Sequence, residues 1–127
     1  MVGKTELYDA FGEMIYVIAK SDGHIQDEEI QAFEKKIEGH PWAQAIKWSF
    51  DYESKHDRSP EELYKKVVSI CEELGPNPEY VFLIEVMEEV AAASKGIDQE
   101  ERAKMNNFSS DLLKKFRKDI QRIEDLD

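Results

Sequence analysis

The chain has 127 residues, with 28 acidic and 17 basic side chains and a formal net charge of −11. This length suits one domain with its own core, so we expect residues 1–127 to form a single folded unit. The negative charge argues against nucleic-acid binding, which depends on neutralising phosphates. Because no apolar run approaches the roughly 20 residues that span a bilayer, we expect no direct membrane insertion. A lone cysteine and an N-terminus without an apolar leader favour a reducing cytoplasm.

Apolar residues recur at helical spacing through the first half of the chain. Residues 6–20 carry them at i, i+3, i+4 and i+7, and residues 27–38 repeat the pattern. Gly39 is expected to end this second helix. A third helix is expected to start at Pro41, because proline suits the first helical position, and to fade within residues 54–58.

The second half of the chain continues the helical pattern. Residues 59–62 (Ser-Pro-Glu-Glu) have the sequence of a capping box with proline at the first position, and Gly75 ends the helix that follows. Residues 77–93 carry apolar side chains around most of the circumference, so we expect this helix to be the central one. A sixth helix should start after Asp98, and a last one should span residues 112–123.

No segment shows the period of two that strands need, and short polar turns separate the helical segments. The sequence therefore predicts an all-α fold, a compact bundle of six or seven helices.

One turn occurs twice in the chain. Residues 19–29 contain an Asp-Gly pair, a lone isoleucine and two glutamates, and a weaker copy follows 72 residues later at 91–101. Gly23 can adopt a positive φ and reverse the chain, while the glutamates lie near the positive end of the next helix. The spacing resembles the second half of a calcium loop. Ile18 and Lys20 occupy positions that would need carboxylates, so we exclude a standard calcium loop.

A gapless shift of 72 residues aligns the two turns and the helices that precede them. The identical pairs include Tyr8/Tyr80, Glu13/Glu85, Ala19/Ala91, Ile25/Ile97, Glu28/Glu100 and Glu29/Glu101. We interpret this pattern as a duplicated helical hairpin packed about a rough twofold axis, with the third and fourth helices between the copies. The alternative is a chance similarity between two amphipathic hairpins.

The first turn carries the pattern Ala-x-x-Asp-Gly-x-Ile-x-x-x-Glu. Its residues are Ala19, Asp22, Gly23, Ile25 and Glu29. This pattern resembles the TerB family of tellurite-resistance domains, and the resemblance covers roughly residues 7–116. It implies an all-α fold with an internal repeat, a bacterial cytoplasmic role in stress response, protein partners and divalent-cation binding through acidic residues. The second copy has Ser94 and Lys95 in place of Asp-Gly, which disfavours two equivalent cation sites.

Five carboxylates of the two turns are candidate ligands for a divalent cation. They would approach one another if the two hairpins packed side by side, and hard cations favour clustered oxygens. The competing interpretation is helix capping and complementarity to the helix dipole. The candidates are Asp22, Glu28, Glu29, Asp98 and Glu101.

No group of residues indicates a reaction. Glu13 and Glu85 match between the copies, but no nucleophile, Gly-rich phosphate loop or oxyanion arrangement accompanies them, so we expect no enzyme. The three histidines have no metal-ligand spacing and are expected in solvated turns. Cys71 lies on the inward side of its helix, where we expect a buried structural thiol.

The sequence therefore favours a non-enzymatic TerB-like interaction domain, with a divalent cation as the candidate ligand of its acidic turn. The alternative is a metal-independent helical scaffold or adaptor that docks a protein partner through Trp42, Trp48 or the basic run at 114–122. That basic run could complement a helix dipole, or it could dock an acidic partner or the acidic face of a second copy. We expect a monomer or a weak homodimer, and neither interpretation identifies the partner.

Overall fold

The computed structural model describes residues 3–21, 25–56, 58–93 and 108–125. Within these ranges the chain forms six helices and no strand, which confirms the predicted all-α bundle. The helix expected after Asp98 falls mostly on residues 98–107, which lie outside the described residues. The six helices are α1 (Lys4–Lys20), α2 (Asp27–Ile37), α3 (Ala43–His56), α4 (Pro60–Leu74), α5 (Glu79–Ala93) and α7 (Phe108–Glu124).

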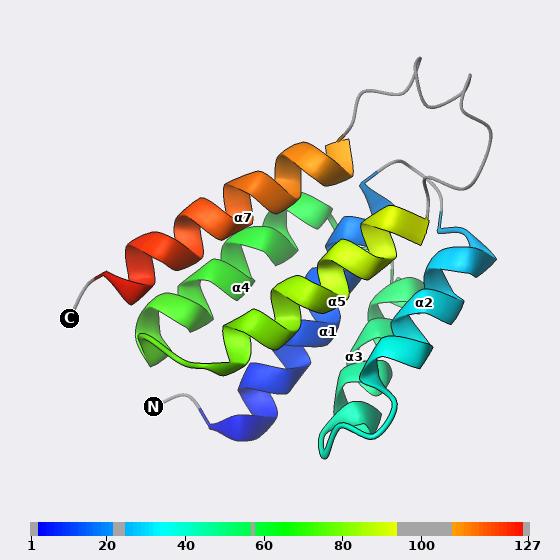
Figure 1. Ribbon diagram of the computed structural model, residues 1–127, viewed down its shortest axis with the longest axis horizontal. Coiled ribbons are helices and arrows are strands. Elements are labelled where there is room, and N and C mark those ends of the chain that lie inside the picture. Colours follow the sequence, from blue (N-terminus) through cyan, green and yellow to red (C-terminus); the bar gives the residue numbers. More distant parts are fainter. Residues whose placement is uncertain (1–2, 22–24, 57, 94–107, 126–127) are drawn as a thin grey trace.

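Helix α1 is the central element, because α3, α4, α5 and α7 all pack against it (Figure 1). Every residue from Ala10 to Ala19 is buried, including the charged side chain of Glu13. The prediction that residues 77–93 form the central helix is therefore wrong. In α5 the side chain of Val81 is 62% exposed and Phe82 is only half-buried. The number of neighbouring helices, and not the apolar content alone, decides how completely a helix is covered.

Gly12 allows α1 and α3 to approach closely. A Cβ atom at this position would overlap the backbone oxygen of Ile46, and it would lie 2.7 Å from Ser49 Cβ and 3.0 Å from Phe50 N. The Ser49 hydroxyl also donates a hydrogen bond of 2.6 Å to the backbone oxygen of Asp9. These contacts fix the inner side of α3 against α1 and leave its outer side facing away from the core.

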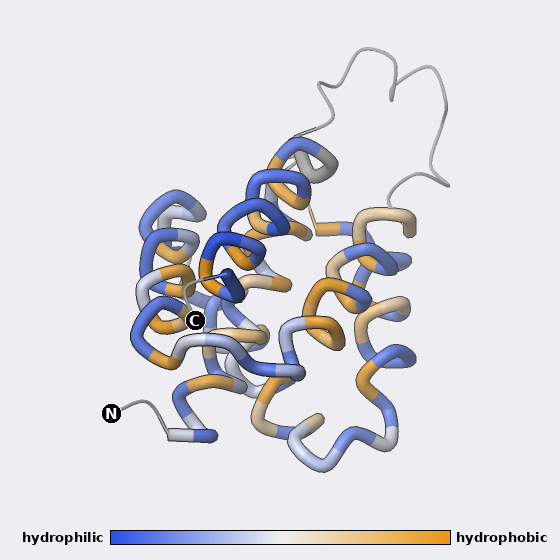
Figure 2. Tube along the Cα trace, turned by 60° about the vertical axis from the view of Figure 1, so that its left-hand side comes forward, coloured by the Kyte–Doolittle hydropathy of each residue, from blue (hydrophilic) through white to orange (hydrophobic). Residues whose placement is uncertain are grey.

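The remaining helices complete the bundle. Helix α2 packs mainly against α5, and α7 lies along α4 and α5 (Figure 1). The Phe33 and Phe50 ring centroids lie 4.7 Å apart and connect α2 with α3. Figure 2 shows hydrophobic residues where the helices face one another and hydrophilic residues along their outer sides. In the described part of the chain, no helix is both long and apolar enough to cross a membrane.

Two glycines end helices as predicted. Gly39 follows α2 with a φ of 87°, and Gly75 follows α4 with a φ of 80°. Both values lie in the left-handed region, which glycine adopts without a steric cost from a Cβ atom. Gly23, which the sequence placed in the same role, lies outside the described residues.

One helix start and one helix cap differ from prediction. Helix α3 begins at Ala43 and not at Pro41, because His40 holds the intervening backbone in a turn through hydrogen bonds. At α4, Pro60 takes the first helical position as predicted. The Ser59 side chain makes no capping hydrogen bond, so the predicted capping box is wrong there. The backbone oxygen of Ser59, and not its hydroxyl, accepts a hydrogen bond from the helix.

Candidate interaction face

The acidic turn is only partly described. Glu29 is buried, and its carboxylate accepts a hydrogen bond of 2.9 Å from the Gln26 N–H in a capping box at the start of α2. Glu28 is exposed. Three of the five predicted cation ligands lie outside the described residues: Asp22, Asp98 and Glu101. Among the residues that are described, no three Asp, Glu, His or Cys side chains lie close enough to hold a metal ion.

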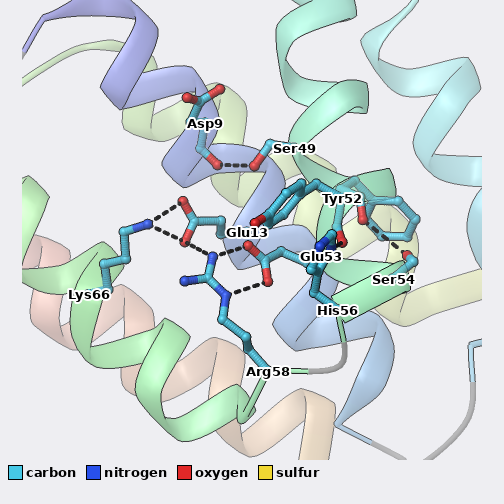
Figure 3. A network of polar contacts seen from close by, with 10 residues as sticks. Asp9, Glu13, Ser49, Tyr52, Glu53, Ser54, His56, Arg58 and Lys66 are labelled. Atoms are coloured by element: carbon cyan, nitrogen blue, oxygen red, sulfur yellow. Dashed lines mark hydrogen bonds and ion pairs between the residues drawn. The ribbon is translucent and has the colours of Figure 1, made fainter.

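Four charged side chains form a network between α1, α3 and α4, which we call the ionic network (Figure 3). Lys66 Nζ donates a hydrogen bond of 3.1 Å to Glu13 Oε1 and lies 3.1 Å from Glu13 Oε2. Arg58 Nε donates to Glu53 Oε1 at 2.9 Å, and a second guanidinium nitrogen donates to Glu53 Oε2. The same guanidinium lies 3.8 Å from Glu13 Oε2. The network thus joins three helices through two carboxylates and two cations.

The carboxylates and the cations of the ionic network differ in exposure. The Glu13 and Glu53 side chains are 4% and 2% exposed, whereas those of Arg58 and Lys66 are 42% and 48% exposed. Burial raises the pKa of Glu13; Lys66 opposes this shift and the nearby Glu53 charge adds to it. The hydrogen bond with Glu53 raises the pKa of Arg58. The cations therefore cover two inner carboxylates and neutralise them, an arrangement that holds α3 and α4 to α1.

Three rings stack along the outer side of α3, and we call this stack the aromatic ladder. Trp48, Tyr52 and His56 are spaced four residues apart, which places them on one side of a helix. The Trp48 and Tyr52 ring centroids lie 5.4 Å apart, and those of Tyr52 and His56 lie 3.9 Å apart. His56 Nδ1–H donates to the Tyr52 backbone oxygen at 2.8 Å. Trp48 is 63% exposed and Tyr52 39% exposed, so the stack is ordered yet open to solvent.

Arg58 connects the aromatic ladder with the ionic network. Its guanidinium carbon lies 6.0 Å from the centroid of the Tyr52 ring while its nitrogens bind Glu53. Figure 3 shows Tyr52 and His56 beside Arg58 on the same side of α3. A cation at this distance is attracted to the ring face. The contacts that hold α3 against α1 therefore also set the position of the exposed rings.

The two tryptophans have different surroundings. Trp42 is half-buried and stacks on Tyr8 with a centroid distance of 5.0 Å. The Tyr8 hydroxyl donates to Glu79 Oε1, and His40 Nε2 lies 3.1 Å from the same oxygen. His40 also stacks on a phenylalanine of α5, so its predicted place in a solvated turn is wrong. Trp42 thus packs on α1, and Trp48 is the more exposed of the two tryptophans.

Cys71 is a buried thiol, as predicted. Burial raises its pKa to about 12, a value at which the reactive thiolate is scarce at neutral pH. The Tyr80 hydroxyl donates to the backbone oxygens of Cys71 and Gly75, at 3.2 and 2.6 Å. Tyr80 of α5 therefore connects its helix to the end of α4.

The basic run of α7 is largely engaged within the chain. Arg117 binds Glu88, and Arg122 lies 3.7 Å from a Glu72 oxygen. Lys115 Nζ lies 4.6 Å from the centroid of the Tyr64 ring. These contacts attach α7 to α4 and α5, and they leave Lys114 and Lys118 as exposed cations.

Two shallow cavities lie along the N-terminal parts of α4 and α7, with volumes of about 510 and 350 Å³. Pro60 and Leu112 line both. Neither cavity includes Glu13 or Glu53, so the inner carboxylates of the ionic network do not face these openings.

Sequence reasoning missed most of this face. Glu13 was noted, and a carboxylate inside an otherwise apolar stretch signals a need for a cation nearby. Which cation it meets depends on how α1 and α4 pack, and the sequence pattern does not contain that information. The spacing of Trp48, Tyr52 and His56 is readable from the sequence, because it is a repeat of four on a predicted helix.

Comparison of this chain with protein families, with curated proteins and with solved structures finds no match.

Proposed function

We propose that this protein is a non-enzymatic interaction domain that docks a protein partner through the aromatic ladder of α3. The observation that carries the proposal is the exposure of two large stacked rings, Trp48 and Tyr52, on a helix whose other side is buried. Tryptophan and tyrosine are enriched among the residues that dominate binding energy at protein interfaces. The rings are already stacked, so less conformational entropy is lost on binding.

The ionic network supports the same proposal. It fixes α3 through Glu53 and Arg58, and Arg58 also contacts the ring of Tyr52. A contact surface on a fixed helix keeps its geometry better than one on a loop. We therefore assign the inner side of α3 to stability and its outer side to recognition.

The TerB-like assignment and a role in bacterial stress response are part of this proposal. Their support is the motif at residues 19–29, in which Ala19 is buried, Ile25 packs against the core and Glu29 caps α2. Each of these roles is structural, which fits a motif that specifies a turn. A cytoplasmic location and a monomeric or weakly dimeric state belong to the same hypothesis.

A divalent cation at the acidic turn stays a prediction. Its direct test is calorimetric titration with calcium, magnesium, manganese and zinc. Heat beyond that of buffer, lost in a Glu28→Gln variant, would support cation binding. A flat titration would leave the metal-independent scaffold as the better description.

The docking proposal is tested by crosslinking in cells. A photoreactive benzophenone amino acid is placed at position 48 in one variant and at position 81 in a control, because Val81 is 62% exposed on another helix. We expect a discrete adduct from position 48, weakened by Tyr52→Ala, and none from position 81. Equal adducts from both positions, or none from position 48, would contradict docking through α3.

A further inference from the structure

A groove lies between the starts of α4 and α7 and reaches the end of α1. The two cavities of about 510 and 350 Å³ adjoin, because they share the lining residues Pro60, Glu61, Leu112 and Lys115. The smaller one also reaches Val17 of α1, which is buried in the core. Both volumes fall in the range of sites that hold small ligands. We call the combined opening the α4–α7 groove, and its lining residues come from helices other than α3, which carries the aromatic ladder.

The walls of the α4–α7 groove are mainly apolar. Pro60 and Leu112 are half-buried and line both cavities, and Tyr64 lines the smaller one. The Tyr64 hydroxyl donates a hydrogen bond of 2.5 Å to Asp119 Oδ2, so the polar end of this side chain is satisfied within the chain. Walls of this kind bind a ligand by removing its apolar part from water.

The groove carries more cations than carboxylates. Lys20 and Lys115 line the larger cavity, and Lys65 lines the smaller one. None of these three ammonium groups forms an ion pair with a carboxylate in the described part of the chain. Glu61 and Asp111 also line the groove, so three positive charges stand against two negative ones. On a chain of net charge −11, this local reversal of sign favours an anion.

Lys115 is the cation whose position in the groove is defined by a contact. Its Nζ lies 4.6 Å from the centroid of the Tyr64 ring. Asp111 and Asp119 are four residues away on either side, a spacing that allows ion pairs on a helix, yet neither pairs with it. Asp119 instead accepts the Tyr64 hydrogen bond and lies 3.9 Å from an Arg122 nitrogen. The Lys115 ammonium therefore stands beside an apolar wall without a counter-charge from a described residue.

We propose that the α4–α7 groove binds an amphiphilic monoanion, which is an acyl chain or ring that carries one carboxylate. Its apolar part lies against Pro60 and Leu112, and its carboxylate pairs with Lys115. The Ser59 hydroxyl makes no capping hydrogen bond and is a further donor at the edge of the groove. One carboxylate matches the single excess positive charge, and an apolar body matches the walls. This site is independent of docking through α3.

The test is a titration of the full-length ¹⁵N-labelled protein with decanoate, kept below its micelle concentration. Decanol and decyltrimethylammonium have the same ten-carbon chain with no charge and with a positive charge, and acetate has the carboxylate without the chain. We expect decanoate to move the backbone N–H signals of residues 61–65 and 111–115. Its affinity should be about fivefold above that of decanol, which is the effect of one partly exposed ion pair. The indole N–H signal of Trp48 should not move.

Two matched variants assign the carboxylate to Lys115. Lys115→Gln should lower the affinity for decanoate to that for decanol. Lys118→Gln removes an exposed lysine of the same helix that is not among the lining residues, and it should leave the affinity unchanged. Far-UV circular dichroism checks that both variants are folded.

Equal binding of the three ten-carbon ligands would overturn the proposal, because it would show unspecific attraction to an apolar surface. Equal effects of the two variants, or the same shifts with acetate, would also overturn it. So would the absence of shifts in the groove with decanoate. If signals of the groove then moved on dilution of the protein, its occupant would be a second copy of the chain.

Discussion

Helices α1 and α5 have matching sequences but different surroundings. The 72-residue shift pairs Tyr8 with Tyr80 and Ala19 with Ala91, and all four residues are buried. Other matched core positions of the two helices are also buried in both. Positions 12 and 13 in α1, however, differ in burial from positions 84 and 85 in α5.

In α1 these positions are Gly12 and Glu13, both buried, whereas in α5 they are Ile84, half-buried, and Glu85, exposed. Helix α1 has neighbours on more sides, and the missing side chain at Gly12 lets α3 approach its backbone. The comparison teaches that an identical glutamate is an inner ionic residue in one copy and a surface residue in the other. Its environment is set by which helices pack around it.

Gly12→Ala should produce the largest effect. The new Cβ would meet backbone atoms of α3, which cannot move aside as a flexible side chain could. Overpacking of this kind costs about 3 kcal/mol. This cost outweighs the gain of about 1 kcal/mol from the better helix propensity of alanine. Urea unfolding followed by circular dichroism measures the change. Ile84→Ala is the matched control, with an expected loss of about 1 kcal/mol. A larger loss at position 84 than at position 12 would reverse the ranking of the two helices.

Glu13→Ala should have the next largest effect, at about 2 kcal/mol. This is below the usual cost of breaking a buried ion pair, because Arg58 and Lys66 are about half exposed and water can solvate them. Glu85→Ala should change stability by less than about 0.5 kcal/mol, since its pair with Lys36 lies at the surface at 3.7 Å. Denaturant unfolding of both variants under one condition makes the comparison. Equal losses would mean that the two glutamates have the same role.

A smaller effect should appear in the pH dependence of stability. Burial raises the pKa of Glu13 in the folded protein, so the folded state retains this proton at a pH where the unfolded chain has released it. The Glu13 contribution to the free energy of unfolding therefore falls as pH rises through its folded pKa. Asp9 shifts in the same direction, so the difference between the wild type and Glu13→Gln isolates Glu13. If the wild type instead gained stability relative to Glu13→Gln as pH rises, the folded protein would have a lowered Glu13 pKa. Glu85→Gln is the control and should show no such slope.

The helices were largely predictable because their signals are local. The apolar spacing showed where the helices lie, and Pro60, Gly39 and Gly75 placed their ends to within a few residues. The central position of α1 was not predicted, because it depends on contacts between helices. Gly12 was a usable signal, since a glycine inside a helical pattern lowers stability unless close packing requires it.

The candidate site was predictable only in part. Trp48 was named from its size, and its spacing to Tyr52 and His56 could be read on the sequence. The different surroundings of Trp48 and Trp42 could not be predicted, because they arise from the turn at His40 and the stacking of Trp42 on Tyr8.

Trp48→Ala tests the central claim most directly, because that claim divides α3 into a stabilising inner side and an outer side kept for a partner. The measurement is the free energy of unfolding in denaturant, with Trp42→Ala as the matched variant. We expect Trp48→Ala to cost less than about 1 kcal/mol, the scale of one exposed ring stack, and Trp42→Ala to cost about 3 kcal/mol through lost packing. Equal losses of about 3 kcal/mol would place Trp48 in the core energetically and contradict an outer face reserved for recognition.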